Sequence, residues 1–207
     1  MAGKTPSQAQ FGIHPGVQMS QTIISAMPEK TGHSLEEWLE IVQEQAPAGE
    51  KERRDWLKSK HGLGLNYASI IAEAAEGKGQ IFTVEGYLRE APKYVEDLFS
   101  GPKAALRPLY EALLAAGLKL GKDVKACPCK TFVPLYRKHV FAQIKPTTRT
   151  RIDLGLALKD LKTPQRLIDT GGFAKKDRIT RRIEITSPDQ IDDDVRRWLK
   201  TAYDLDA

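Results

Sequence analysis

The chain has 207 residues, and 41% of them are hydrophobic, which is enough for one domain of ordinary size and a second, smaller one. No apolar run approaches the length of about 18–20 residues that crosses a bilayer, and the polar segment from Met1 to Pro15 lacks the apolar core of a secretion signal. Two cysteines, Cys127 and Cys129, are too few for a disulfide framework, so we expect a soluble cytoplasmic protein with no membrane partner.

The net charge of +5 is unevenly distributed along the chain. Residues 1–90 carry nine basic and twelve acidic side chains, whereas residues 91–207 carry 23 basic and 15 acidic ones. Within the second part, residues 130–182 hold fourteen basic and four acidic side chains, a net charge of +10. A basic cluster of this size attracts phosphate-rich or acidic partners, although lysine-rich surfaces that bind nothing are also common.

The first part of the chain predicts a tail followed by helices. Residues 1–18 contain few large apolar side chains and are expected to be disordered. A short helix is expected over 19–27, ended by Pro28. Three further short helices are expected within 30–76, and the first of them begins at the capping box Ser34-Leu-Glu-Glu37.

The glycine-containing stretch 77–79 predicts a linker between two domains. On that basis we divide the chain into a disordered tail at 1–18, a helical module at 19–78 and a basic α+β domain at 79–207.

In the second domain the spacing of apolar residues changes from helical to strand-like. A helix over Leu106 to Leu114 contains Pro108, so it is either kinked or begins later than its periodicity implies. Apolar alternation then predicts an antiparallel meander and a closing helix, with strands over 130–137, 140–145, 149–158 and 178–186 and the helix over 191–202. We therefore expect an α+β fold, in which a small three-helix module precedes a helix, an antiparallel sheet of four or five strands and a C-terminal helix.

Two parts of the sequence resemble bacterial domains of unknown function. The segment from Lys30 to Leu39, followed by Trp56 to Gly64 and Tyr67-Ala68, resembles a small helical domain. The segment from Tyr94 to Tyr203 is similar to a second domain, which some annotations label "predicted transport protein". The strings Lys130-Thr-Phe132, Phe141-Ala142 and Arg151 to Leu156 carry this second resemblance. Together the two imply membership of families, but no activity and no catalytic residues.

The string from Gly62 to Ile71 lies between two expected helices and is similar to the hairpin of helix-hairpin-helix DNA-binding motifs. In such hairpins, glycines let the backbone approach a phosphate, which is bound by N–H groups at the helix N-terminus. Gly62, Gly64 and Asn66 are therefore candidate phosphate-binding residues. The alternative is a glycine C-cap between two packed helices, which the acidic balance of residues 1–90 favours.

A basic face of the predicted sheet is the second candidate site. If Ala142 and Ile144 point into the core, Phe141 and Lys145 point outward. An aromatic ring among basic side chains can hold a nucleic-acid strand by stacking and phosphate contact, although the same pattern also describes a solvated face. Further basic residues follow along the chain, among them Lys175, Lys176 and Arg178. The candidate binding residues are Lys130, Phe141, Lys145, Arg149, Arg151, Asp153, Arg181 and Arg182.

No motif in the sequence is typical of a metal or catalytic site. Cys127-Pro-Cys129 and a distant His139 lack the paired spacing of zinc ligands. Asp153 and Glu184 lie on neighbouring strands but lack the Glu-x-Lys of a nuclease site, so Asp153 is expected to pair with Arg151 or Lys130. Zincin, phosphate-loop, nucleophile-elbow and dinucleotide motifs are missing. We expect no metal, no cofactor and no catalytic residue.

These observations predict a non-enzymatic binding protein whose basic sheet face meets an acidic partner, with nucleic acid as the first candidate. One alternative is an adaptor for a protein or a small ligand. A second is an enzyme with its site around Lys130, Arg151 and Asp153. Salt dependence separates the first two hypotheses, because phosphate binding weakens steeply with salt.

Overall fold

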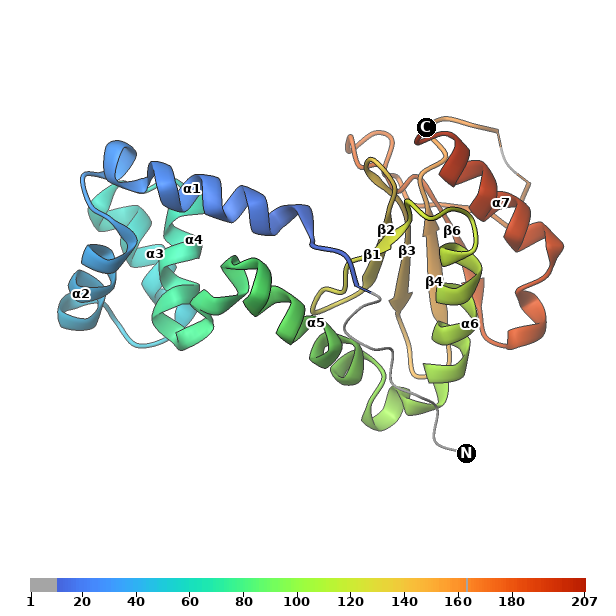
Figure 1. Cartoon of the computed structure of the whole chain (residues 1–207), viewed down its shortest axis with the longest axis horizontal. Coiled ribbons are helices and arrows are strands. Elements are labelled where there is room, and N and C mark those ends of the chain that lie inside the picture. Colours follow the sequence, from blue (N-terminus) through green and yellow to red (C-terminus); the bar gives the residue numbers. More distant parts are fainter. Residues whose placement is uncertain (1–10, 163) are drawn as a thin grey trace. The chain divides into compact units, whose positions relative to one another are not determined.

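The computed structural model describes residues 11–162 and 164–207, which divide into two compact units (Figure 1). The helical unit comprises Ile13–Glu90, and the α+β unit comprises Phe11 and Gly12 together with Ala91–Ala207. Residues 1–10 of the expected tail lie outside the described part of the chain. The rest of that segment is structured, because Phe11 forms a bridge with Ala126 and the first helix begins at Pro15.

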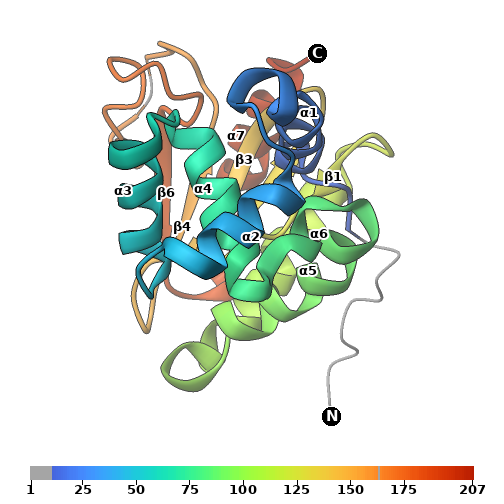
Figure 2. The ribbon, with the colours of Figure 1, turned by 90° about the vertical axis from the view of Figure 1, so that its left-hand side faces the viewer.

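The helical unit contains the three helices expected within 30–76 and adds others on both sides. Figure 2, in which this unit faces the viewer, shows α3 and α4 side by side. The bounds of its elements are α1 (Pro15–Thr31), α2 (Leu35–Gln45), α3 (Glu50–His61), α4 (Leu65–Glu73), the short turns η2 (Ala74–Lys78) and η3 (Gly79–Phe82), and α5 (Val84–Leu98), inside which the boundary between the units falls. The glycines at 77–79 therefore lie in helical turns, and the compact units separate further along the chain, after Glu90.

Helix α1 does not end at Pro28 as expected. It continues to Thr31, and Gly32 ends it in the left-handed conformation, where the Gly32 N–H donates to the carbonyl of Pro28. Proline lacks an N–H and so removes one helical hydrogen bond, but at Pro28 this loss falls in the last turn. The glycine cap therefore determines where the helix ends.

The capping box at the start of α2 is confirmed. Glu37 N–H donates to the hydroxyl of Ser34 at 3.2 Å, and the carboxylate of Glu37 accepts from Ser34 N–H at 2.7 Å. Behind it, Trp38 is buried against Met27 and Leu57 in the core of the helical unit. The cap thus fixes the start of α2, the helix that contributes Trp38 to this core.

The α+β unit consists of an antiparallel sheet with α6 and α7 on one face (Figure 1). Within the described residues, six strands follow the order β1-β2-β3-β4-β6-β5, so the expected α+β class is confirmed. The bounds are η4 (Gly101–Leu106), α6 (Arg107–Leu118), β1 (Lys125–Ala126), β2 (Val133–Tyr136), β3 (Val140–Pro146), β4 (Ile152–Leu156), β5 (Ile168–Asp169), β6 (Arg181–Ile185), η5 (Pro188–Gln190) and α7 (Asp193–Asp204). No helix in the described part of either unit is both long and apolar enough to cross a membrane.

Two features of the helices follow directly from proline and cap chemistry. Pro108 lies in the first turn of α6, so the helix begins at Arg107 and is not kinked. The capping box of Ser187 and Gln190 encloses only the short turn η5, and α7 starts afterwards with Asp192 as its own N-cap, accepting from Val195 N–H at 2.9 Å.

Strands β3 and β4 place their apolar residues in the core as the alternation predicts. Ile152, Leu154 and Leu156 are fully buried, and Ile144 and Ala142 face Leu154 and Leu156 across the strand pair. In an antiparallel pair, residues directly opposite share a face. The other face of the same strands therefore carries Gln143, Lys145 and Asp153, with Arg151 just before β4.

Phe141 is the exception, and the expectation that it points outward with Lys145 is wrong. Leu135 pairs with Ala142 and Tyr136 with Val140, which leaves Phe141 as an extra residue in the ladder. Such a β-bulge breaks the two-residue alternation. Phe141 is fully buried, with its ring 5.7 Å from that of Tyr203 on α7, so it is unavailable for stacking with a ligand.

We expect Leu154→Ala to destabilise the α+β unit by about 2–5 kcal/mol, because it opens a cavity at the centre of the sheet. The measurement is the free energy of unfolding from urea titration followed by circular dichroism. Lys145→Ala, an exposed position on the neighbouring strand, serves as control and is expected to change stability by less than about 0.5 kcal/mol. Equal losses from both substitutions would contradict the assignment of the two faces.

Candidate ligand-binding site

The basic sheet face predicted from the sequence is electrically neutral at its centre. Arg151 lies 2.9 Å from Asp153 and 2.9 Å from Glu184, and Arg182 lies 3.2 Å and 2.6 Å from the same two carboxylates. The strand register produces this cluster, because Asp153 is directly opposite Glu184 in the β4–β6 pair. Two arginines and two carboxylates cancel, so the centre of the face has no net charge. Of the two partners expected for Asp153, Arg151 and Lys130, the structure shows the pairing with Arg151.

Hydrogen bonding within this cluster is uneven. The hydrogen bond from Arg182 lowers the pKa of the Glu184 carboxyl, and the charge of Arg151 adds to the effect. Nε of Arg151 and Oδ1 of Asp153 are buried and 2.9 Å apart, yet neither makes a hydrogen bond with suitable angles. The attraction between this pair is therefore that of two charges in contact, without a directed bond.

The remaining candidate residues of the sheet do not converge. Arg181 pairs with Asp169 at 3.1 Å and donates to the carbonyls of Thr180 and Leu161. The other three candidates are exposed and form no ion pair with any residue that the structure describes; they are Lys130, Lys145 and Arg149. These three lie before β2, at the end of β3 and in the β3–β4 turn, so they are spread along the unit.

The candidate hairpin at residues 62–64 has the geometry of a helix cap. Gly62 is left-handed, with φ of 66°, and its N–H and that of Leu63 both donate to the carbonyl of Leu57. These two N–H groups are therefore used within the chain. Gly64 caps α4 and Asn66 is exposed in its first turn. The geometry favours the C-cap reading.

The two cysteines are unsuited to thiolate chemistry at neutral pH. Burial raises the pKa of Cys127 to about 12 and that of Cys129 to about 11, and both thiols are free. Among residues 11–162 and 164–207, no three His, Cys, Asp or Glu side chains are grouped so as to hold a metal ion.

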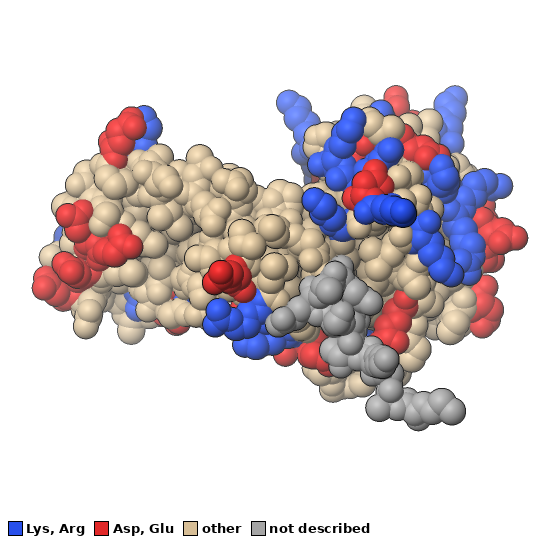
Figure 3. Space-filling model, viewed as in Figure 1, with Lys and Arg blue, Asp and Glu red and all other residues tan. Residues whose placement is uncertain are grey.

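The α+β unit contains a pocket of about 460 Å³ at the end of the sheet where β4 ends and β6 begins. The end of α7 lies at the same end of the sheet (Figure 1). We call this cavity the C-terminal pocket, and its lining residues are Ala157, Lys159, Phe173, Lys176, Asp177, Arg178, Thr180, Ala202, Leu205 and Asp206. Figure 3 shows that Lys and Arg gather on the visible face of this unit.

The C-terminal pocket combines an apolar floor with a cationic rim. Ala157 and Ala202 are buried and supply small apolar surfaces, while Lys159 and Lys176 are exposed beside them. Neither lysine ammonium pairs with a carboxylate in the described parts of the chain. An apolar cavity with a few charged groups at its margin is the usual composition of a ligand site.

Both rim lysines have an unusual backbone conformation. Lys159 has φ of 52° and Lys176 has φ of 57°, and they are the two non-glycine residues with positive φ in the part of the chain that the structure describes. Such a conformation disfavours residues with a Cβ, and it concentrates at functional sites, where surrounding structure holds it in place. Here the two instances line the same pocket.

The turn that carries Phe173 is held by its own hydrogen bonds. Gly171 is left-handed, with φ of 69°, and a Cβ at Gly172 would lie 2.2 Å from the carbonyl oxygen of Ile179. The carbonyl of Gly172 accepts from the N–H groups of Lys175 and Asp177 at 3.0 and 2.9 Å. The turn therefore has a defined shape, and it leaves Phe173 61% exposed.

A buried carboxylate fixes one wall of the C-terminal pocket. Asp206 is 4% exposed and accepts from Arg178 at 2.7 Å and from the backbone N–H of His139 at 2.7 Å, and it contacts Nδ1 of the same histidine at 3.0 Å. Arg178 also donates to the carbonyl of Val140. The β2–β3 turn, the loop before β6 and the end of α7 are thereby joined at one charge.

Sequence reasoning placed Lys176 and Arg178 in a basic segment but did not connect them with Lys159, Phe173 or Asp206. These groups are far apart along the chain, and only the loop conformations bring them to one cavity. The Gly171-Gly172 pair before an aromatic residue in a basic loop was the signal available, because two glycines favour a tight turn that presents the next side chain.

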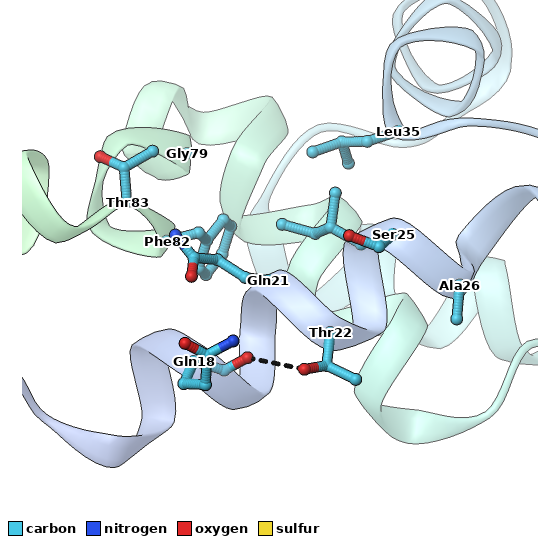
Figure 4. Close-up of a pocket in the computed structure, with 10 residues that line it drawn as sticks. Gln18, Gln21, Thr22, Ser25, Ala26, Leu35, Gly79, Phe82 and Thr83 are labelled. Atoms are coloured by element: carbon cyan, nitrogen blue, oxygen red, sulfur yellow. Dashed lines mark hydrogen bonds between the residues drawn. The ribbon is translucent and has the colours of Figure 1, made fainter.

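The helical unit has its own groove of about 900 Å³, drawn in Figure 4, and it has a different chemistry. Gln18, Thr22 and Ser25 line one side along α1, with Thr22 Oγ1 donating to the carbonyl of Gln18 at 3.0 Å. Leu35 and Phe82 supply apolar surface opposite. All ten lining residues are uncharged, so this groove offers nothing that would select an acidic partner.

The fold and the site define an α+β protein with a ligand-sized cavity at one end of its sheet. Residues 95–206 match the family model "Domain of unknown function (DUF5655)", and residues 19–77 match "Domain of unknown function (DUF4287)". The first match covers more than half of the chain, so the chain belongs to the DUF5655 family. This confirms the pairing of two domains of unknown function expected from the sequence. No curated protein and no solved structure matches the chain.

We expect Asp153→Asn/Glu184→Gln to make the sheet face attract polyanions. The substitutions leave Arg151 and Arg182 without their carboxylates, so the charge of the cluster rises from 0 to +2. Fluorescence anisotropy with a labelled oligonucleotide is expected to show tighter binding than wild type and a steeper salt dependence. Asp97→Asn/Asp189→Asn, two exposed positions elsewhere in the unit, changes the net charge equally. An equal gain in this control would mean that total charge, and not the cluster, determines binding.

We expect Asp206→Asn to destabilise the α+β unit by about 1.5–3 kcal/mol, since it removes a charged acceptor from Arg178 and His139. Urea unfolding measures the loss. Asp204→Asn on the same helix is the control, because Asp204 is exposed and pairs with Lys200 at the surface. If both variants unfold at the same urea concentration, the buried carboxylate does not hold this wall.

Proposed function

We propose that the α+β unit is a cytoplasmic, non-enzymatic binding module for a phosphate-bearing ligand, with nucleic acid or its components as the first candidate, and that the ligand binds in the C-terminal pocket. The observation that carries the proposal is the pair of unpaired lysines, Lys159 and Lys176, at the margin of an apolar cavity. A lysine ammonium on a flexible stem binds phosphate as a compact point charge. Free, protonated thiols at Cys127 and Cys129 agree with a reducing compartment.

The charge distribution favours the pocket over the sheet face as the place of binding. Arg151 and Arg182 are already engaged by Asp153 and Glu184, so a phosphate there would have to displace an existing carboxylate. At the pocket the two lysines have no such competitor. The proposal therefore keeps the acidic partner expected from the sequence and moves its site to the loops.

The volume of the pocket supports a small molecule or one unit of a polymer. Ligand pockets usually measure about 300–1,000 Å³, and the C-terminal pocket, at about 460 Å³, lies within this range. A small-ligand function was also the alternative left open by the sequence. A small molecule and one unit of a polymer would each place one anionic group against Lys159 and Lys176.

We expect Lys159→Ala/Lys176→Ala to weaken the binding of a short, fluorescein-labelled single-stranded oligonucleotide about tenfold or more at low salt. Binding by the wild-type chain is expected to be micromolar or weaker, as is usual for phosphate-led contact. The variant should also flatten the dependence of log K on log salt by about 0.7 for each phosphate contact that is lost. Anisotropy titrations at two salt concentrations measure both quantities.

The matched control is Lys145→Ala/Arg149→Ala, which removes two unpaired cations on the sheet side of the unit. It should leave affinity and salt slope close to those of the wild type. Equal losses from the two variants would mean that diffuse charge binds the oligonucleotide. An absence of binding at low salt, to this oligonucleotide and to mononucleotides alike, would overturn the proposed function.

A further inference from the structure

We infer that the C-terminal pocket takes a single nucleotide unit, with its base stacked on Phe173 and its phosphate against Lys159 and Lys176. This inference rests on the proposed function and adds the chemistry of the ligand. The unit is either a free mononucleotide or the terminal nucleotide of a strand. Both present the same flat ring and the same terminal phosphate, so the structure assigns them one site.

Phe173 is the residue that points to a flat ligand. It is 61% exposed, the highest value among the large hydrophobic residues that are exposed in the described chain, and it is the one aromatic among them. An isolated exposed apolar residue needs no explanation, but Phe173 lines a cavity that also holds unpaired cations. Aromatic side chains beside a positive groove are the means by which proteins bind the bases of single-stranded nucleic acids.

The ring is presented by a turn that is formed before any ligand binds. The carbonyl of Phe173 accepts from Lys176 N–H at 3.1 Å, while Gly172 accepts from two N–H groups further along the turn. Thr170 Oγ1 accepts from Gly172 N–H and donates to the carbonyl of Ile179 at 2.6 Å, which ties the turn to the start of β6. A backbone held in this way loses little conformational freedom when the Phe173 ring stacks on a ligand.

The floor of the pocket suits a flat ring with polar edges. Ala157 and Ala202 project only methyl groups, so a planar ligand can lie against them without being displaced by larger side chains. Thr180 is 2% exposed, and its hydroxyl oxygen accepts from Leu158 N–H at 3.3 Å. That hydroxyl has no acceptor for its own proton among the residues described, so it can donate to a ring nitrogen or carbonyl.

The charges of the pocket match a terminal phosphate better than a carboxylate. Arg178 is neutralised by Asp206. Asp177 keeps its negative charge, although its Oδ1 accepts from Ile179 N–H, so the lining residues carry three cations and two carboxylates, a net charge of +1. The two lysines are the cations of the lining that no carboxylate of the described chain pairs with. A phosphate monoester carries a charge of about −1.5 to −2 at neutral pH and three acceptor oxygens, so it can engage both ammonium groups at once. A carboxylate has one charge for two cations.

Isothermal titration calorimetry of the full chain with four probes tests the inference. The probes are adenosine monophosphate, ribose 5-phosphate, adenosine and decanoate, which separate the ring, the phosphate and a merely apolar anion. We expect adenosine monophosphate to bind about 5- to 150-fold more tightly than ribose 5-phosphate, the range that stacking of one base provides. Adenosine, which lacks the phosphate, should bind more weakly than its monophosphate.

Two substitutions at one position isolate the ring. Phe173→Ala should reduce adenosine monophosphate to the affinity of ribose 5-phosphate and leave ribose 5-phosphate unchanged. Phe173→Trp should retain the tight binding and report it as quenched tryptophan fluorescence. Because Phe173 is exposed, both variants should unfold at the wild-type temperature, so a loss of binding cannot be attributed to a loss of fold.

The outcomes separate this inference from the proposed function. Stacking on Phe173 would be overturned by equal affinities for adenosine monophosphate and ribose 5-phosphate, or by tighter binding of decanoate than of either. In that case the ribose 5-phosphate titration alone decides whether the lysines bind phosphate. Binding of neither phosphate nor of the oligonucleotide would overturn both. If stacking holds, two further probes distinguish a free nucleotide from the end of a strand as the ligand. A site for strand ends binds a 5′-phosphorylated trinucleotide more tightly than the free nucleotide, and it does not bind a circular strand.

Discussion

The carboxylate of Asp206 is withdrawn from solvent, and the compensation of this one charge joins three segments of the chain at the candidate site. A buried charge is costly unless it is paired and hydrogen-bonded, so Arg178 and the backbone of His139 are drawn to it from two different loops. Once Arg178 is fixed there, the loop that follows β5 must pass beside the end of α7. That path positions Lys176 and Phe173 at the mouth of a cavity whose floor is formed by the alanines at 157 and 202.

The same principle, applied at the sheet, removes a site that composition alone predicts. A net charge of +10 over residues 130–182 indicates a basic surface, but strand register decides which charges remain available. Pairing Asp153 with Glu184 across β4 and β6 places two carboxylates where Arg151 and Arg182 also lie. Of the unpaired cations, Lys130, Arg149, Lys159 and Lys176 lie in turns and loops, and Lys145 lies next to the last residue of β3.

Local chemistry accounts for what the sequence predicts well. The capping box at Ser34 and the apolar alternation of Ile152, Leu154 and Leu156 each depend on residues a few positions apart, and both are confirmed. For α6, Pro108 left a kink or a late start open, and the structure shows a helix that begins at Arg107. The burial of Phe141 depends on the β-bulge between β2 and β3. The sequence of β3 alone cannot predict this bulge, because it arises from how β3 pairs with β2. The C-terminal pocket depends on contacts between segments from residue 139 to residue 206, so its members could be noticed singly but not assembled.

The shape of the sheet also limits how this protein meets its partners. Its outermost strands, β1 and β5, are two residues long, and each ends the ladder with a charged side chain, Lys125 in one and Asp169 in the other. Short, charged edge strands give an incoming extended peptide almost no backbone groups to pair with. Short edges of this kind disfavour both strand addition by another protein and edge-to-edge polymerisation, and at β1 the bridge from Phe11 to Ala126 already uses part of the edge.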